Sequence, residues 1–404
     1  MRVLVVGSGG REHALAWKLS QAESGIEVHA APGNPGIAAI GACHPVRAED
    51  GEGLLGLARE LGVDLVVIGP EVPLVAGVAD QLRKGGVAVF GPSAAAARIE
   101  GSKTFAKHVM RAAGVPTAEP LSVARPPCVI KADGLAAGKG VFVCRTQEEV
   151  ESGVRAAAAL GEGFLIEELL QGEELSLFAL VDGSRVLPLA AARDYKRVGD
   201  DDTGPNTGGM GAFSPVPEIE VEELVDKLHR PVVDQLARRG APFIGLLYAG
   251  LMLTENGPRV LEFNCRFGDP ETQSILPRLE GDVLATLAAA AEGDLGDAEL
   301  SVSESAAVTV VLASGRYPEQ GDVGTPIEGV EAAQAEGALV FHAGTAVRDG
   351  QLVTNGGRIL NVTAVGDSLE EARSRAYAAS ERISFAGCRY RGDIAFDGVN
   401  VAGC

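Results

Sequence analysis

The N-terminal part of the sequence alternates between short apolar runs and helical patterns, and this restricts the folds it can adopt. The apolar run Val3–Val6 leads into the glycine turn Gly7–Gly10, and a helical pattern follows at Glu12–Ser20. Further strand candidates are Ile26–Ala31, Leu65–Ile68 and Val87–Phe90. Helical stretches lie between them at Gly53–Leu61 and Val75–Lys84. Strands and helices that alternate at this spacing predict a parallel, doubly wound sheet. This unit ends near Pro92.

The rest of the 404 residues is too long for one ordinary core and predicts further domains. Its strand candidates are Cys128–Lys131, Val141–Cys144, Phe164–Glu168, Glu174–Val181, Leu246–Leu253, Arg259–Phe263, Ala306–Ala313, Leu339–Gly344, Leu352–Asn355 and Ile359–Ala364. Helices are expected at Lys103–Gly114 and Glu222–Arg239. Asp200–Gly211 is polar and glycine-rich without periodicity, and Gly296–Ser305 reads as a linker.

Charge and composition exclude several classes of partner. A formal net charge of −20 and an aromatic content of 4% argue against binding of nucleic acid or of an anionic membrane. No apolar run approaches the ~18 residues of a membrane span, and the N-terminus does not resemble a signal peptide. The six cysteines have no paired spacing, which fits free thiols in a reducing cytoplasm and gives no support to structural zinc.

The richest motif is the segment Val260–Gln273. Glu262 and Asn264 are two residues apart on a predicted strand, so their side chains share one face and set two hard oxygen ligands side by side. Mg²⁺ suits such a pair because it takes its other ligands from water and phosphate. A polar strand end is the simpler alternative. The following turn, Arg266–Glu271, packs a guanidinium, a glycine, a proline and two acids together, which favours a functional site.

Two glycine-rich loops predict phosphate contacts. Lys131 precedes the loop Asp133–Gly140, which joins two antiparallel strands and is therefore not a Walker A loop. Such a loop, carrying Lys139, can close over phosphates and exclude water, although a merely mobile hairpin is the alternative. The segment Thr203–Gly211 offers backbone amides and hydroxyls for an anion. The aspartates before it, Asp200–Asp202, read as a solvated run.

The N-terminal turn resembles a dinucleotide fingerprint only weakly. Glu12 stands at the sixth position, where close helix–sheet packing requires glycine. Gly9 at the helix start, with Arg11 in reach, instead suits one phosphate or a sugar. A tight strand-to-helix turn without a ligand is the alternative reading. Farther along, the acids from Glu167 to Glu174 adjoin an apolar strand, an arrangement that can hold a purine and its ribose hydroxyls.

Together these motifs resemble those of the ATP-grasp ligases, and within them the family that joins glycine to 5-phosphoribosylamine in de novo purine biosynthesis. The resemblance runs from Gly7–Ala14 to Gly356-Gly357-Arg358, and the string Arg266–Glu271 is the most specific to it. It implies an α/β and α+β multidomain fold. A Rossmann-like pre-ATP-grasp domain would span residues 1–100, and a split ATP-grasp domain 101–300, with a mobile lid at about 117–182. A small α+β domain would span 301–404.

The resemblance also implies roles for individual residues. ATP would be bound by Lys103, Lys131, Gly138, Lys139, Gly140, Glu168, Leu170 and Glu174. Glycine and 5-phosphoribosylamine would be bound by Gly9, Arg11, Glu12, Glu71, Asn206, Thr207, Gly268 and Asp269. Glu262 and Asn264 would hold Mg²⁺ or Mn²⁺, and Arg266 and Lys139 would act in catalysis. The γ-phosphate and the glycine carboxylate are expected to meet near Cys265. The partners would be these small molecules alone, for a cytoplasmic monomer or weak dimer.

Three other functions fit parts of the sequence. Another ATP-grasp enzyme, such as a biotin-dependent carboxylase subunit or a formate-using purine ligase, shares the ATP half but not the strings Asp202–Gly211 and Arg266–Gln273. A nicotinamide-dependent oxidoreductase conflicts with Glu12. A non-catalytic relative would be expected to have lost Glu262, Asn264 or Lys131. The chain departs from the family pattern at Tyr195, where histidine is expected, and in a short segment between Thr117 and Cys128.

Overall fold

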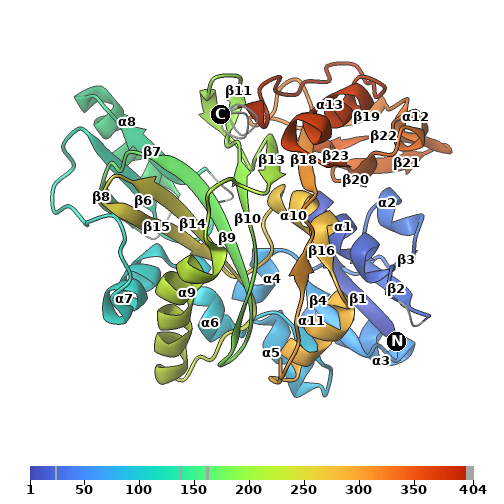
Figure 1. Cartoon of the computed structure of the whole chain (residues 1–404), viewed down its shortest axis with the longest axis horizontal. Coiled ribbons are helices and arrows are strands. Elements are labelled where there is room, and N and C mark those ends of the chain that lie inside the picture. The colour runs from blue at the N-terminus through green and yellow to red at the C-terminus, as the bar shows by residue number, and fades with distance from the viewer. Residues whose placement is uncertain (23–24, 137–138, 161–162, 397–404) are drawn as a thin grey trace.

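The N-terminal residues form the parallel sheet that their alternating pattern predicts. The computed structural model describes residues 1–22, 25–136, 139–160 and 163–396 (Figure 1). The strands are β1 (Arg2–Gly7), β2 (Glu27–Pro32), β3 (Ala42–Cys43), β4 (Leu65–Ile68) and β5 (Val89–Phe90). They pair in parallel in the order β3-β2-β1-β4-β5. The helices are α1 (Gly10–Leu19), α2 (Pro35–Ala38), α3 (Gly51–Leu61), α4 (Glu71–Val75), α5 (Val78–Lys84) and α6 (Ala94–Gly101).

One predicted helix of this unit, Val75–Lys84, is wrong at its start. α4 ends at Val75 and α5 begins only at Val78. Gly77 between them has φ +84°, a left-handed conformation that interrupts an α-helix and that glycine adopts without a steric penalty.

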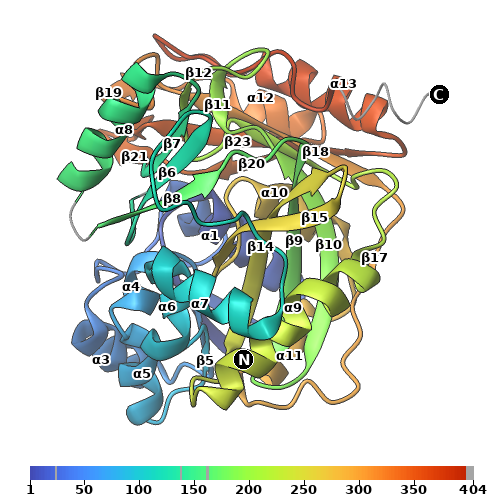
Figure 2. The ribbon, with the colours of Figure 1, turned by 90° about the vertical axis from the view of Figure 1, so that its left-hand side faces the viewer.

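A small three-stranded sheet, the lid sheet, follows the helix α7 (Lys103–Ala113). Its strands are β6 (Cys128–Ala132), β7 (Val141–Cys144) and β8 (Phe164–Glu168), antiparallel in the order β7-β6-β8. The helix α8 (Gln147–Ala159) covers it. The glycine-rich loop therefore joins two antiparallel strands, as the sequence predicts. Figure 2 shows this sheet standing apart from the large sheet, above α7.

An eight-stranded sheet forms the centre of the molecule, in the order β15-β14-β9-β10-β13-β18-β23-β20. Its strands are β9 (Glu173–Asp182), β10 (Val186–Asp194), β13 (Gly211–Ser214), β14 (Ile244–Thr254), β15 (Gly257–Asn264), β18 (Ala306–Ala313), β20 (Leu339–His342) and β23 (Arg358–Gly366). The predicted hairpin of β14 and β15 is confirmed. The pairing of β13 with β18 carries the sheet across the predicted linker, part of which forms β17 (Ser301–Val302) against β16 (Leu279–Glu280).

The remaining helices and one further small sheet follow. The helices are α9 (Val221–Arg238), α10 (Glu271–Ile275), the short 3₁₀ turn Leu276–Arg278, α11 (Val283–Ala291), α12 (Val330–Ala335) and α13 (Leu369–Ser380). The strands β19 (Asp322–Pro326), β21 (Thr345–Arg348) and β22 (Gln351–Gly356) form a separate sheet. No helix among the described residues is long and apolar enough to cross a membrane.

The segment Asp200–Gly211, expected to be irregular, contains the strand β12 (Thr203–Asn206), which forms a hairpin with β11 (Arg197–Gly199) just before the segment. Asp200, Asp201 and Asp202 at its tip are exposed, as the sequence predicts, and contacts with the C-terminal part hold them in place. The buried Arg391 donates to Asp202 (2.8 Å), and Gly392 N–H donates to Asp200 (2.8 Å). Asp201 N–H donates to Asp393 (2.9 Å). Sequence spacing gave no signal for these contacts because their partners lie about 190 residues away.

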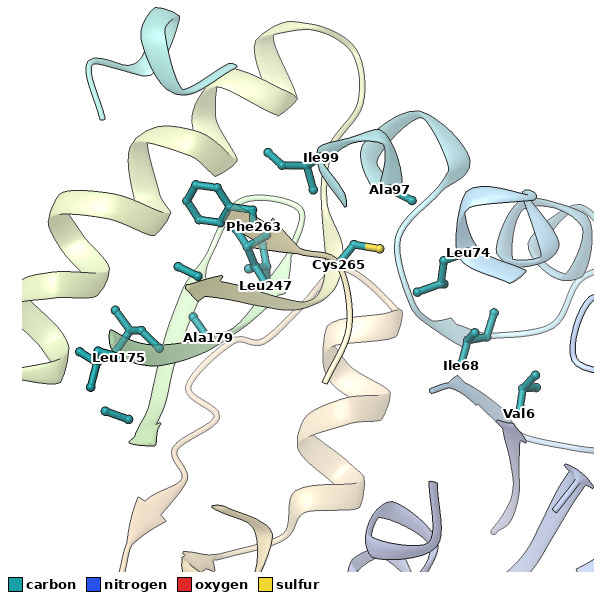
Figure 3. Packing of buried hydrophobic residues seen from close by; sticks show 14 of the residues in the cluster. Val6, Ile68, Leu74, Ala97, Ile99, Leu175, Ala179, Leu247, Phe263 and Cys265 are labelled. Atoms are coloured by element: carbon teal, nitrogen blue, oxygen red, sulfur yellow. The ribbon is translucent and has the colours of Figure 1, made fainter. Parts of the chain in front are cut away.

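The apolar core continues from the N-terminal unit into the large sheet. Phe263 of β15 and Leu247 of β14 pack together, and Cys265 lies between them and the side chains Ile68 and Leu74 (Figure 3). Cys265 has no solvent exposure. The strand that carries Glu262 and Asn264 is thus fixed against the N-terminal unit by its own buried residues.

The N-terminal and C-terminal parts also meet through a buried histidine. The unprotonated Nδ1 of His13 accepts a hydrogen bond from His342 N–H (2.8 Å). Burial, and secondarily His342, lowers the pKa of His13 from 6.5 to about 3. The unfolded chain therefore binds the extra proton first as the pH falls.

We predict that this histidine makes the protein acid-sensitive between about pH 6.5 and pH 3. Its contribution reduces the free energy of unfolding by at most about 1.4 kcal/mol per pH unit in that window. His13→Gln, which keeps a hydrogen-bond acceptor, should flatten the fall measured by urea unfolding from pH 7 to pH 5. The exposed His108→Gln serves as the control. An unchanged pH slope in His13→Gln would contradict the prediction.

Candidate active site

The two predicted metal ligands lie side by side at the end of β15. Asn264 Nδ2 is 3.5 Å from Glu262 Oε1, and Asn264 is 9% exposed. No cluster of three or more His, Cys, Asp or Glu residues that could hold a metal occurs within the described ranges. The pair therefore fits a hard cation that takes most of its ligands from elsewhere, as Mg²⁺ does with water and phosphate.

Two of the predicted ATP lysines converge on this pair from the lid side. Lys131 Nζ, on β6, donates to Leu261 O (2.9 Å), and Lys103 Nζ, at the start of α7, donates to Gly134 O (2.9 Å). Burial lowers the pKa of Lys103, while Glu262 acts in the opposite direction and more strongly than the other acids around it. Two lysines thus lie near the end of β15, on the side of the lid sheet.

The residues predicted for the ATP-binding loop lie between β6 and β7, and two of those predicted for the hinge of the lid lie at and after the end of β8. Gly138 lies outside the described residues, and Lys139 is exposed. Gly140 O accepts from Ala132 N–H (2.8 Å), and a Cβ on Gly140 would lie 2.6 Å from Ala136 Cβ, so glycine is required there. Glu168, at the end of β8, accepts from Glu119 N–H (3.0 Å). Leu170 is half-buried in the segment that connects β8 to β9.

Glu174, predicted to hold ribose hydroxyls, forms an ion pair with Lys196. Lys196 also pairs with Asp194 (3.1 Å). Burial by itself lowers the pKa of Lys196. The carboxylates of Asp194 and Glu174 more than offset this effect and raise that pKa well above its ordinary value. Lys196 and Asp194 were not predicted from the sequence. Nothing in their spacing indicated that β10 passes beside the start of β9.

The N-terminal turn is occupied by its own side chains. Glu12 Oε2 accepts from Gly9 N–H (2.6 Å), and Glu12 Oε1 pairs with Arg11 Nε (2.5 Å). Arg11 also donates to Phe267 O (3.1 Å). The turn is thus joined to the segment Arg266–Glu271, and Gly9 N–H is not free for a phosphate. A Cβ on Gly9 would lie 3.5 Å from Asp269 Oδ2.

Arg266 lies between two carboxylates of the N-terminal unit. Its guanidinium is 3.1 Å from Glu71 Oε2 and 3.1 Å from Glu100 Oε1. Burial by itself raises the pKa of Glu71. The guanidinium groups of Arg266 and Arg11 more than offset this effect and lower that pKa to about 2. Burial raises the pKa of Glu100, and the charge of Arg266 offsets this rise only in part. Glu100 was not among the predicted residues.

Asp269 and the segment after Asn206 are joined by an arginine of the C-terminal part. Arg358 Nη2 pairs with Asp269 Oδ2 (3.2 Å), and its Nη1 donates to Asp269 O (2.8 Å) and Gly208 O (2.6 Å). Thr207 Oγ1 donates to Lys196 O (2.8 Å). Asn206 ends β12, half-buried beside Thr207. A Cβ on Gly268 would lie 2.6 Å from Glu271 Oε2, so no larger residue fits over that carboxyl.

Glu271 is a further buried acid that sequence reasoning left without a role. It is 4% exposed, and its Oε1 accepts from Ser176 Oγ (3.3 Å). Burial, and then Asp194, raises the pKa of Glu271 to about 7. Ser176 Oγ is also 3.1 Å from Tyr248 Oη. This polar group lies beneath the turn and supports it from the side of the large sheet.

Comparison with known families finds matches along nearly the whole chain. The phosphoribosylglycinamide synthetase N domain matches residues 1–100, its ATP-grasp (A) domain residues 101–272, and its C domain residues 307–397. A phosphoribosylamine–glycine ligase of Streptomyces coelicolor is 51% identical, with 98% of this chain and 99% of that protein covered. One of Leifsonia xyli is also 51% identical, at 98% and 99% coverage.

Solved structures agree with these matches. The crystal structure of phosphoribosylamine–glycine ligase from Thermotoga maritima has a TM-score of 0.84 and 37% identity, covering 97% of this chain and 100% of that one. The biotin carboxylase domain of 2-oxoglutarate carboxylase from Hydrogenobacter thermophilus has a TM-score of 0.69 at 17% identity, covering 100% and 94%. The second likeness shows a shared fold alone.

The position of Arg266 generates a stability prediction. Arg266→Gln leaves Glu71 and Glu100 without their shared cation, and should cost about 3 kcal/mol at pH 7, the lower end for a broken buried ion pair. The stability that comes from the low pKa of Glu71 is present above pH 4.5 and is lost as the pH falls toward 2. The difference between variant and wild type should therefore shrink at low pH.

Urea unfolding at pH 7 and at pH 3 measures this difference. The exposed Arg348→Gln, which removes a charge outside any ion pair of the described chain, should stay within about 0.5 kcal/mol of wild type. A pH-independent difference for Arg266→Gln would argue against the ion-pair explanation.

Proposed function

This chain belongs to the phosphoribosylglycinamide synthetase family, and we infer from this membership that it is a ligase of purine biosynthesis. It joins glycine to 5-phosphoribosylamine and cleaves ATP to ADP and phosphate. The products are glycinamide ribonucleotide, ADP and phosphate. One observation supports this assignment above all others. About half of the residues are identical to those of phosphoribosylamine–glycine ligases, over nearly the full length of both chains.

The reaction proceeds in two steps that need no covalent enzyme intermediate. The glycine carboxylate attacks the γ-phosphorus of ATP, which gives glycyl phosphate and releases ADP. The amine of 5-phosphoribosylamine then attacks the glycyl carbonyl, and phosphate leaves with the bonding electrons of the C–O bond. The protein contributes mainly position and charge, as in other phosphoryl transfers.

For the first step we propose that Lys103, Lys131 and Lys139 bind the ATP phosphates. Lys131 directly precedes the lid loop and Lys103 contacts Gly134 near its start, so their charges would offset the negative charge that develops on the transferred phosphoryl group. Gly138 and Gly140 would let the loop approach the phosphates. Glu168, Leu170 and Glu174 would line the nucleoside end of the cleft. Mg²⁺ held by Glu262 and Asn264 would supply a Lewis acid that screens the phosphate oxygens.

For the second step we propose that the turn after β15 binds glycine and 5-phosphoribosylamine. Arg266, Gly268 and Asp269 follow the metal pair directly, and Gly9, Arg11, Glu12 and Glu71 close the turn from the N-terminal side. Asn206 and Thr207 would close it from the β11–β12 hairpin. The reacting groups would meet near the backbone of Cys265, whose thiol is buried in the core.

We further propose that the enzyme works in the cytoplasm as a monomer or weak dimer. It would accept Mn²⁺ in place of Mg²⁺, and its partners would be small molecules only. The net charge of −20 supports the absence of nucleic-acid and membrane partners.

The proposed activity predicts strict co-substrate dependence. Purified protein should release ADP only when glycine, 5-phosphoribosylamine and a divalent cation are all present, measured by a coupled ADP assay. Formation of AMP, or ADP release that does not depend on glycine, would rule out the reaction.

The proposed metal site predicts a large loss in Glu262→Ala. Turnover should fall by about 10²–10³-fold, as expected when one transition-state contact is removed. The melting temperature should remain close to that of wild type, because Glu262 is half-buried and forms no ion pair among the described residues. Glu255→Ala, in the exposed turn between β14 and β15, is the matched control. Near-normal turnover of Glu262→Ala would remove the metal assignment.

A further inference from the structure

A groove of about 970 Å³ lies beside the connecting segment that leads into the lid sheet. Its walls are α7, α9, the turn between β14 and β15, and the connecting segment 114–120 that leads into the lid. α7 and α9 pack side by side below the lid sheet (Figure 2). Neither Glu262 nor Asn264 lines the groove, and neither do the lysines Lys103 and Lys131. Its volume is of the size that holds a small metabolite.

The charge of this groove is opposite to that of the whole chain. Its lining includes four basic side chains, Lys107, Arg111, Lys227 and Arg259, and a single acid, Glu119. The chain as a whole has 35 Lys and Arg residues against 55 Asp and Glu residues. Arg111 forms no ion pair within the described part of the chain, and Lys227 pairs only with the exposed Glu223. A local excess of positive charge on an acidic protein concentrates anions at that place.

The deeper groove residues are bonded to the lid. Lys107 Nζ donates to Thr117 Oγ1 (2.6 Å) and Ala118 O (3.1 Å), and it pairs with Glu167 Oε1 (2.8 Å) on β8. The other oxygen of that carboxylate, Glu167 Oε2, is 2.9 Å from Lys131 Nζ. One buried carboxylate thus connects a groove lysine to a lysine of the proposed ATP site.

A second contact connects the groove to the same strand. Arg259 donates to Thr117 O (3.2 Å) and lies 3.6 Å from Glu168 Oε1. Glu167 and Glu168, two neighbouring acids of β8, are therefore each paired with a cation that also lines the groove. An anion in the groove competes with Glu167 and Glu168 for Lys107 and Arg259.

We propose that this groove is a regulatory site for a small phosphate-bearing anion, distinct from the ATP cleft. The rim residues Arg111 and Lys227 attract the anion, and Lys107 and Arg259 sense it. When Lys107 turns toward the anion, Glu167 keeps only Lys131 as its partner and holds it more tightly. Lys131 is then less available to ATP phosphates, so the two ligands oppose each other with reciprocal coupling. This coupling rests on the proposed ATP site, whereas the groove itself does not.

Calorimetric titration with inorganic pyrophosphate, in metal-free buffer at fixed ionic strength, tests the site directly. We expect wild type to bind pyrophosphate, and the double variant Arg111→Glu/Lys227→Glu to lose at least ten-fold in affinity. The double variant Lys84→Glu/Arg348→Glu makes the same charge change at exposed positions outside the groove and should bind as wild type does. Equal affinity in all three proteins, or no binding to wild type, would overturn the proposal.

A second measurement tests the coupling, and its failure can be told apart from a failure of the enzymatic assignment. Pyrophosphate bound at the ATP cleft alone would weaken binding of a non-hydrolysable ATP analogue equally in wild type and in Arg111→Glu/Lys227→Glu. We expect several-fold weaker analogue binding by wild type at saturating pyrophosphate, and a smaller effect in the groove variant. An identical effect in both proteins would overturn the regulatory role. Neither measurement requires turnover.

Discussion

The ion group around Arg266 is the interaction on which the arrangement of the site depends. β15 ends at Asn264, and the turn that follows has no regular backbone pairing to hold it. Arg266 fixes this turn by pairing with Glu71 of α4 and Glu100 of α6. Glu100 Oε2 also accepts from Cys265 N–H (2.8 Å). The end of β15, the turn and the N-terminal unit are therefore held together by one group of charges, in which the loss of a single cation leaves two acids unmatched.

The C-terminal part completes this group from the opposite side. Arg358 binds the backbone and side chain of Asp269 and the carbonyl of Gly208, so one guanidinium holds the turn after β15 and the segment after β12 together. Arg391 does the same for the tip of the β11–β12 hairpin, where Asp201 and Asp202 have left-handed φ values of +52° and +51°. Such a conformation is unfavourable for residues other than glycine and persists only when its surroundings impose it. The site is thus built at the junction of all three parts of the chain.

Local patterns predicted the parts of this protein that depend on local physics. The parallel sheet follows from alternating apolar runs and helical stretches, and the β14–β15 hairpin from a turn at Glu255–Gly257 between two apolar strands. The pairing of Glu262 with Asn264 follows from the two-residue period of a strand. The interruption at Gly77 and the β11–β12 hairpin were not predicted, and the tip of that hairpin is held by residues about 190 positions away.

The missed site residues share one property, namely that their partners are distant in sequence. Each of them forms an ion pair with a residue far along the chain: Lys196 with Glu174, Glu100 with Arg266, and Arg358 with Asp269. Charge alone does not distinguish such residues from the many acids and bases of an exposed surface. Burial beside an opposite charge does, because a desolvated ion without a partner is too costly to keep. This argument extends to Lys107: its contacts with Glu167 and the hinge are needed to compensate its burial, and they place it between the lid and the groove. A lysine so placed transmits a change on either side to the other.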